Sequence, residues 1–288
     1  MSKIFKTFSP RTKSVILILI TIFLFSMMDD VAKILVQTYT SDQVIWARYM
    51  SQTIVSIIVL FPILNKVLVT KFFKLQLLRS TFLFFATYFF FTSLKYLQLV
   101  QVNAIFQVAP IFVTLLSAFV LKEYINIKRW GGVIIGMLGA LLIIRPGAEV
   151  FSINIILPAI AALCYASYVI STRFLSQEES ATTNFIYSSL IGSILASILV
   201  IPSWISIDSS DLFVFSGFGL LGALGHLFLI NAFRMSEASF LAPFNYLNLV
   251  FGTIWGFYIF DEIPGFFTIT GSLVIVSSGI YIWIKDKK

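Results

Sequence analysis

The sequence has very little charge. Only 11% of its 288 residues are charged, whereas soluble domains carry about 25%. Hydrophobic residues make up 59% of the chain, and the mean hydropathy is +0.97. So few charges cannot cover a surface that faces water, so lipid must be the solvent for most of the chain. The sequence therefore predicts an all-α integral membrane protein, because open strands leave backbone groups unsatisfied in lipid.

Cysteine and histidine each occur once, as Cys164 and His226. One cysteine excludes a disulfide within the chain, and no Cys/His cluster is available to hold a structural metal. No Walker A, HExxH or GxSxG motif is present. We therefore expect no cofactor, no metal and no catalytic residue. The net charge of +7 does not indicate nucleic-acid binding, because the charges lie in short gaps between apolar runs.

Ten apolar runs approach the length of roughly 20 residues that a helix needs to cross a bilayer. They are 14–36, 44–64, 75–97, 100–121, 130–144, 153–174, 182–201, 213–233, 239–260 and 266–284. Placing the N-terminus inside also puts most of the 20 Lys and Arg residues inside, including the set Lys66, Lys71, Lys74 and Arg79 in the second loop. We expect both termini in the cytoplasm and a multi-pass protein of the cell inner membrane.

The two halves of the chain, 14–147 and 151–285, align at an offset of 139 or 140 positions. Four pairs carry this alignment: Lys33 with Arg173, Lys95 with Arg234, Glu123 with Glu262, and Gly132 with Gly271. Each half holds five expected helices, and five is odd, so the second half is inserted upside down. Inverted repeats are typical of secondary transporters.

Several charged residues lie near helix ends and are candidates for a gate or for ion pairs. They are Asp29, Asp30, Lys33, Arg48, Lys95, Arg173 and Arg234. Asp29 and Asp30 can pair with Lys33 at helical spacing, which favours a structural cluster at the outer gate. A substrate carboxylate or a proton site is the alternative there, and simple anchoring of helix ends is the alternative for the whole set.

Polar side chains deep in a span cost free energy unless they have partners or face water. Asn103 and Gln107 share one face of the fourth run, shortly before Pro110. Asn245 and Asn248 lie in the ninth run, just after a second proline at 243. We favour a central polar cavity between these runs over hydrogen bonding between packed helices.

His226, which aligns with Thr87 of the first half, is either a packed donor or a proton carrier. Tyr88, Tyr165 and Tyr246 can stack on a planar or cationic group of a substrate. The pair Gly252 and Gly256 allows either packing within a monomer or a homodimer contact.

Several stretches together resemble the EamA type of the drug/metabolite transporter superfamily over nearly the whole length. They are WARY at 46–49, APIFVTLL at 109–116, RWGG at 129–132, RPG at 145–147 and APFNY at 242–246. The last stretch is similar to the subgroup that contains S-adenosylmethionine and riboflavin uptake permeases.

The resemblance implies alternating access by rocking of the halves around a cavity lined by helices one, three, four, six, eight and nine. It places Asn103, Gln107, His226, Asn245 and Asn248 near the substrate. Where many relatives have Glu-Pro in the ninth helix, this chain has Asn248-Leu249, which speaks against a carboxylate contact at that position.

These observations predict a permease for a small organic metabolite, with proton coupling left open. The alternative is a membrane scaffold that transports nothing, or an intramembrane enzyme.

Overall fold

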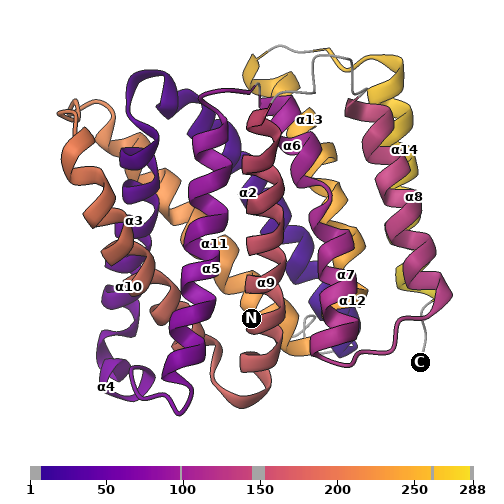
Figure 1. Ribbon diagram of the computed structural model, residues 1–288, viewed down its shortest axis with the longest axis horizontal. Helices are drawn as coiled ribbons and strands as arrows, with labels where there is room; N and C mark the ends of the chain where they lie inside the picture. Colours follow the sequence, from indigo (N-terminus) through magenta and orange to yellow (C-terminus); the bar gives the residue numbers. More distant parts are fainter. Residues whose placement is uncertain (1–7, 98, 145–152, 261–262, 286–288) are drawn as a thin grey trace.

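The computed structural model describes residues 8–97, 99–144, 153–260 and 263–285, and every regular element in these ranges is helical. The longer helices stand side by side in a bundle (Figure 1). Their bounds are α2 Pro10–Thr38, α3 Ser41–Leu60, α5 Phe73–Ser93, α6 Leu99–Phe106, α7 Ala109–Val120, α8 Ile127–Ile144, α9 Ile156–Glu178, α10 Ala181–Val200, α11 Leu212–Met235, α13 Leu247–Phe260 and α14 Phe266–Lys285. The short elements are η1 Phe61–Ile63, α4 Leu64–Val67, η3 Ile153–Ile155, η4 Ile201–Ser203, α12 Ala238–Leu241 and η5 Ala242–Tyr246.

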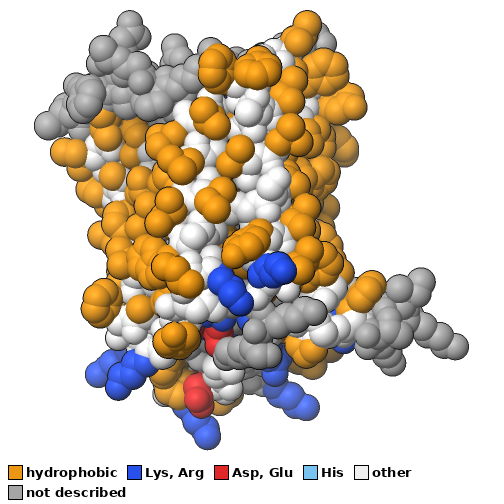
Figure 2. Space-filling view, turned by 90° about the vertical axis from the view of Figure 1, so that its right-hand side faces the viewer, with side chains coloured by type: hydrophobic (Ala, Val, Ile, Leu, Met, Phe, Trp, Pro, Cys, Tyr) orange, Lys and Arg blue, Asp and Glu red, His pale blue; other side chains and the backbone are white. Residues whose placement is uncertain are grey.

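Seven of the described helices are long and apolar enough to cross a membrane, and Ala109–Val120 is a shorter apolar helix. Figure 2 shows apolar side chains covering the flank of the bundle, with Lys, Arg, Asp and Glu gathered toward its lower end. A flank of this kind faces lipid, because such a large apolar surface is not left in water. The chain is therefore a multi-pass membrane protein.

Hydroxyl side chains start equivalent helices in the two halves. The Thr40 hydroxyl accepts from the backbone N–H of Gln43 at 3.3 Å and caps α3. Ser180, 140 positions later, accepts from the N–H of Thr183 at 3.0 Å and caps α10. Such a cap satisfies one of the four backbone donors that a helix leaves unpaired at its start.

The expected fourth and ninth runs are interrupted helices. The fourth is broken between α6 and α7, next to Pro110 in the first turn of α7. The ninth consists of α12, the 3₁₀ segment η5 and α13, with Pro243 at the start of η5. Proline lacks the N–H that would continue the α-helical ladder, so both breaks follow from the sequence.

Helices pack across the two halves of the chain in reciprocal pairs. The most extensive contacts are α8 with α14, α2 with α11, α5 with α9, and α3 with α10. The repeat alignment makes α10 the counterpart of α3 and α14 the counterpart of α8, so each of these helices packs on its own counterpart. The alignment also maps the pair α2–α11 onto the pair α9–α5. In the same way, the alignment maps the pair α2–α13 onto the pair α9–α7.

The same reciprocity holds for single residues between α8 and α14. Ser278 donates to the carbonyl of Gly132 at 2.8 Å, and a Cβ on Gly132 would overlap the Ile282 side chain. The counterpart positions repeat this contact: a Cβ on Gly271 would lie 2.6 Å from the carbonyl of Gly139 and 2.7 Å from Ile143. Glycine is required at 271, because the obstructing atom there belongs to the backbone of the other helix.

The start of α2 and the end of α14 lie at one end of the bundle, the lower end in Figure 1. Ser14 bonds to Ser236 at 2.6 Å, and Lys128 donates to the carbonyl of Lys285 at 3.0 Å. The α2–α3 connection and the α10–α11 connection meet at the upper end, where the Tyr39 hydroxyl donates to Asp211 at 2.6 Å. The described chain therefore begins and ends on the same side.

The prediction that Arg79 lies in a loop is wrong. Arg79 is fully buried in α5, where it donates to the carbonyl of Asn184 and, at 2.8 Å, to Ser188. It is therefore no loop cation, because neighbouring helices supply the acceptors that a buried guanidinium needs. Glu262, named in the repeat alignment, lies outside the described residues.

Candidate substrate cavity

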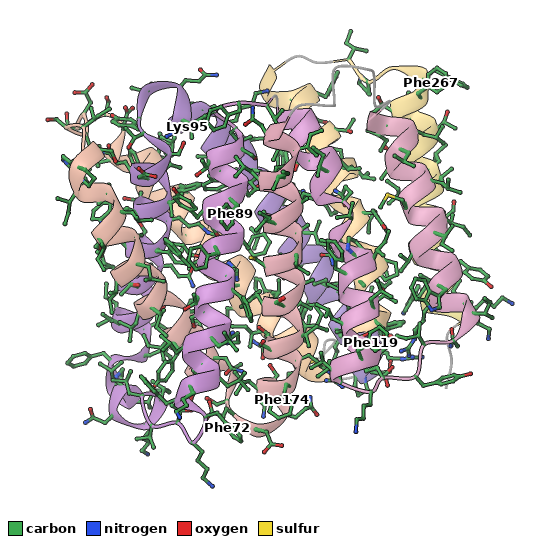
Figure 3. The ribbon with its side chains drawn as sticks, in the orientation of Figure 1. Phe72, Phe89, Lys95, Phe119, Phe174 and Phe267 are labelled. Atoms are coloured by element: carbon green, nitrogen blue, oxygen red, sulfur yellow. The ribbon has the colours of Figure 1, made fainter. Side chains whose placement is uncertain are left out.

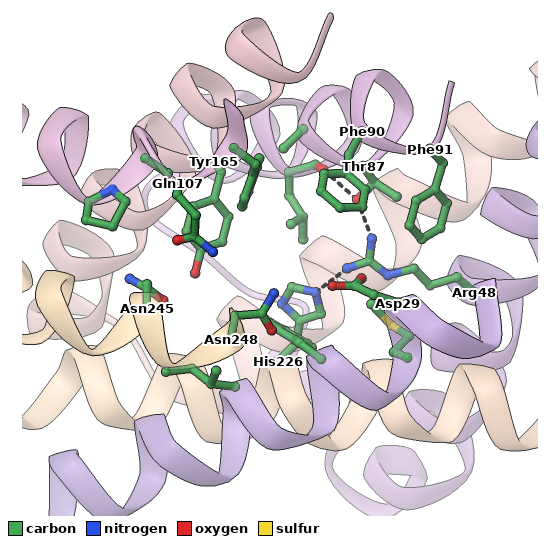
Figure 4. A pocket seen from close by; sticks show the side chains of 18 residues that line it. Asp29, Arg48, Thr87, Phe90, Phe91, Gln107, Tyr165, His226, Asn245 and Asn248 are labelled. Atoms are coloured by element: carbon green, nitrogen blue, oxygen red, sulfur yellow. Dashed lines mark hydrogen bonds between the residues drawn. The ribbon is translucent and has the colours of Figure 1, made fainter. Parts of the chain in front are cut away.

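A cavity lies in the middle of the bundle, between the two halves (Figure 4). It contains about 790 Å³ of space free of atoms, a volume that includes the part open to solvent. Its walls come from α2, α3, α5, the α6–α7 break, α9, α11 and the η5–α13 region. The interrupted helices thus border the cavity, where their freed backbone groups can be satisfied.

Arg48 of α3 holds the two halves together at the cavity wall. Its guanidinium donates to the Thr87 hydroxyl on α5 and, at 2.6 Å, to His226 Nε2 on α11 (Figure 4). Thr87 and His226 are counterparts at the offset of 139. The guanidinium therefore bridges two equivalent positions of the repeat.

This contact fixes the protonation state of His226. A guanidinium only donates, so Nε2 must accept and the imidazole must be neutral, with its proton on Nδ1. The Tyr168 hydroxyl lies 3.3 Å from Nδ1 and is the acceptor for that proton. His226 is thus a packed partner of Arg48 and Tyr168 in this conformation.

Asp29 of α2 supplies the negative charge of the cavity wall. Its carboxyl group is within electrostatic range of Asp30 and of Arg48, and within hydrogen-bonding reach of the Asn248 amide. Asp29 and Arg48 are the only charged residues among those that line the cavity in the described part of the chain. The wall therefore carries one charge of each sign.

Three amides complete the polar surface of the cavity. Gln107 lies at the break between α6 and α7, Asn245 in η5, and Asn248 in the first turn of α13. Asn245 donates to the carbonyl of Ala242 at 3.2 Å, and Asn248 Oδ1 has no hydrogen-bond partner among the described residues. The Oδ1 acceptor of Asn248 is therefore available to a ligand.

Aromatic rings form much of the remaining wall. Phe106 stands edge-on to Phe90, with ring centroids 5.2 Å apart, and contacts Tyr165 at 5.5 Å. Phe91 packs on Phe218, and Phe25 lies 4.8 Å from the His226 ring. Such a wall suits a flat ring system, because aromatic pairs favour stacked or edge-on contact.

Three of the expected substrate residues lie outside the cavity wall. Asn103 is half-buried one turn before Gln107, and Tyr88 stacks on Phe84 with ring centroids 6.2 Å apart. The Tyr246 ring is fully buried and occupies the space beside Gly136 on α8. The structure therefore brings together Gln107, Tyr165, His226, Asn245 and Asn248, and adds Arg48 from the second predicted helix.

The expected gate residues separate into three places. Asp29 and Arg48 face the cavity. Asp30 is buried in α2, and Lys33 follows it one turn later. Lys95 lies toward the upper end, whereas Phe72 and Phe174 lie at the other end of the bundle (Figure 3). Arg173 and Arg234 belong to the lower end, where Arg173 donates to the carbonyl of Phe233 at 2.8 Å.

Glu123 joins the halves at the lower end. Its carboxylate accepts from the backbone N–H groups of Ala238 and Ser239, both at 3.0 Å, and from the Ser239 hydroxyl at 2.7 Å. Arg173 lies 3.6 Å from the same carboxylate. Arg129 adds an ion pair to Glu237 and a bond of 2.7 Å to Ser239. We call these residues, Glu123, Arg129, Arg173 and 237–239, the lower interlock.

Comparison with known protein families gives a match along nearly the whole chain. The EamA-like transporter family covers residues 12–145 and again 152–284. The chain belongs to the EamA-like transporter family.

Individual relatives of this EamA protein are more distant. It is 30% identical over 179 residues to the S-adenosylmethionine uptake transporter of Rickettsia conorii, which covers 62% of this chain and 61% of that relative. It is 28% identical over 180 residues to the riboflavin transporter of Vibrio cholerae, covering 62% and 60%. A crystal structure superposes with a TM-score of 0.81 at 15% identity, covering 94% of this chain and 96% of the other, and shows the same fold.

Sequence reasoning missed two polar residues of the site. Thr87 was noted only as the counterpart of His226, and Tyr168 carried no signal beyond one aromatic among many. The repeat alignment contained the clue, because counterparts near an internal two-fold axis are brought close together. Arg129 lies in the first turn of α8, and its partner Glu237 lies in the two-residue connection between α11 and α12.

Proposed function

We propose that this protein is a secondary transporter that moves a small organic metabolite across the cytoplasmic membrane by alternating access. The observation that carries this proposal is the central cavity, whose wall combines an acid and a base, three amides and aromatic rings drawn from both halves of the chain. A membrane scaffold has no need of such a cavity, since polar groups inside a membrane protein are costly.

The architecture that we propose is ten crossings in two inverted five-helix repeats, 14–147 and 151–285, with both termini in the cytoplasm. Supporting it, α6 with α7 and α12 with α13 each make up one crossing, and the chain begins and ends on the same side. The reciprocal packing of α8 on α14 at Gly132 and Gly271 is what a two-fold axis in the membrane plane produces.

The lower interlock is the closed gate of this conformation in our proposal. It joins the α7–α8 connection and the first turn of α8 to the α11–α12 connection and the start of α12. Opening toward the lower end has to break these bonds between the two halves.

The substrate class follows from the wall and from the relatives. S-adenosylmethionine and riboflavin, named for the two relatives above, both contain a flat heteroaromatic ring system. The Phe90, Phe106 and Tyr165 rings supply a matching surface, and the amides of Gln107, Asn245 and Asn248 supply donors and acceptors for ring edges.

Uptake into proteoliposomes tests the transporter proposal. We expect the purified protein to carry radiolabelled S-adenosylmethionine or riboflavin into vesicles with saturable kinetics, and protein-free vesicles to show only leakage. If neither compound is taken up, and neither raises the melting temperature of the protein, the proposed substrate class is refuted.

The topology has a separate test. A tag inserted in the exposed connection at 203–211 lies at the upper end, and we expect an impermeant reagent to label it on intact cells. Labelling only after lysis would reverse the proposed orientation.

A further inference from the structure

The charge balance of the cavity points to one type of ligand. Asp29 and Arg48 face the cavity, and the described part of the chain contributes no other charged residue to its wall. His226 is neutral, because its Nε2 accepts from Arg48. The wall therefore has no net formal charge but contains a positive and a negative group.

These two groups are coupled without bonding to each other. The carboxyl group of Asp29 interacts electrostatically with Asp30 and with Arg48, but no ion pair joins Asp29 and Arg48 among the described residues. A structural ion pair in a membrane normally closes into direct contact, since only good geometry offsets the desolvation of two charges. The arrangement seen here leaves both charges directed to the cavity.

Arg48 also retains unused donors. Its two terminal nitrogens each make one bond, to Thr87 and to His226, so each has one further N–H. The Nε group, packed beside Gly222, is buried and has no partner. Thr87 and His226 hold the guanidinium in place, so little side-chain freedom is lost when an anion binds.

On the acid side, Asn248 adds an acceptor. Its Oδ1 is buried and has no hydrogen-bond partner in the described part of the chain, and its amide lies within reach of the Asp29 carboxylate. One carboxylate and one amide oxygen together suit an ammonium group, which has three N–H donors and no acceptor.

We propose that Asp29 and Arg48 form a head-group subsite for the zwitterionic ammonium and carboxylate of an amino-acid derivative. The ligand carboxylate bonds to the terminal nitrogens of Arg48, and the ligand ammonium bonds to Asp29 and Asn248. The flat part of the ligand then lies along Phe90, Phe106 and Tyr165. This inference rests on the proposed function and narrows it to ring compounds that carry an amino-acid group, such as S-adenosylmethionine, and away from riboflavin.

Competition binding tests the subsite with matched ligands. The probe is radiolabelled S-adenosylmethionine on purified protein in nanodiscs. The competitors are S-adenosylhomocysteine, which keeps the amino-acid group, decarboxylated S-adenosylmethionine, which lacks the carboxylate, and 5′-methylthioadenosine, which lacks the whole amino-acid group. We expect loss of the carboxylate to weaken competition about tenfold to a hundredfold, as for other charge-assisted bonds.

Substitutions test which side chain binds the carboxylate and which binds the ammonium of the ligand. Arg48→Gln should weaken S-adenosylhomocysteine by more than tenfold and decarboxylated S-adenosylmethionine by less than threefold, and Arg48→Lys should restore part of the difference. Asp29→Asn should weaken both of these ligands while leaving 5′-methylthioadenosine unchanged. Lys74→Gln and Asp208→Asn, at exposed positions outside the cavity, are the control variants.

The outcomes separate the two proposals. If 5′-methylthioadenosine or riboflavin competes as well as S-adenosylhomocysteine, the head-group subsite is refuted while the transporter proposal stands. Equal weakening of all ligands in Arg48→Gln shows a structural role for Arg48 and also refutes the subsite. If the wild-type protein binds no compound of the panel, the substrate class of the proposed function fails first.

Discussion

Removing the carboxylate of Glu123 should open the lower end of the cavity. This carboxylate accepts two backbone N–H groups and one hydroxyl from the second half, with Arg173 beside it. Bonds to a charged group contribute about 1.5–3 kcal/mol each, but the three share one carboxylate and are not additive. Arg129 also remains paired to Glu237. We therefore expect Glu123→Ala to cost the closed conformation about 2–4 kcal/mol.

A loss of that size shifts the equilibrium between closed and open conformations by about thirtyfold or more. A single cysteine in the cavity wall reports this shift. Ala109→Cys in a Cys164→Ser background places a small reactive group there, since Ala109 lines the cavity. In vesicles oriented with the lower end outward, an impermeant maleimide should label it at least tenfold faster when Glu123→Ala is added.

The matched control is Glu178→Ala, which removes an exposed carboxylate from the end of α9. Glu123→Gln, which keeps an acceptor oxygen but no charge, should give an intermediate rate. If Glu123→Ala labels within twofold of the parent protein, or speeds labelling equally from both sides, the interlock is not a gate.

Two further substitutions test the packing and the role of His226. Gly271→Ala pushes a methyl group into the carbonyl of Gly139 and should destabilise the protein by about 1–3 kcal/mol, whereas Gly217→Ala, which meets open space, should be neutral or slightly stabilising in thermal unfolding. Equal melting temperatures for the two variants would contradict the close contact of α8 and α14. His226→Gln keeps an acceptor for Arg48 but cannot take up a proton, so we expect uptake and its pH dependence to persist, while His226→Leu loses uptake. Loss of pH-driven uptake in His226→Gln alone would instead identify His226 as a proton carrier.

Much of the fold could be predicted from the sequence, because lipid imposes a simple rule on it. Each apolar run of sufficient length has to become a helix, and seven of the described helices are long and apolar enough to cross a membrane. Proline at 110 and 243 marked the two broken helices, since a missing N–H interrupts any helix. The pairing of charges was less predictable, because Asp29, Lys33 and Arg48 are close in sequence and suggested a local cluster.

The residues of the site were predictable only in part. Gln107, Asn245 and Asn248 were identifiable because an amide in a span needs either a partner or a cavity. Asn103 satisfied the same criterion and yet lies outside the wall, because the side on which a residue faces depends on how its helix is rotated against its neighbours.

The sequence by itself determined the membrane environment, the two related halves and the broken helices, since these follow from hydrophobicity, spacing and proline chemistry along the chain. Only the tertiary structure decided that Arg48 reaches Thr87 and His226, that Asp29 faces the cavity, and that Glu123 meets the start of α12. Each of these contacts joins residues that are far apart in the chain, and packing of helices from both halves, not local sequence, sets their distance.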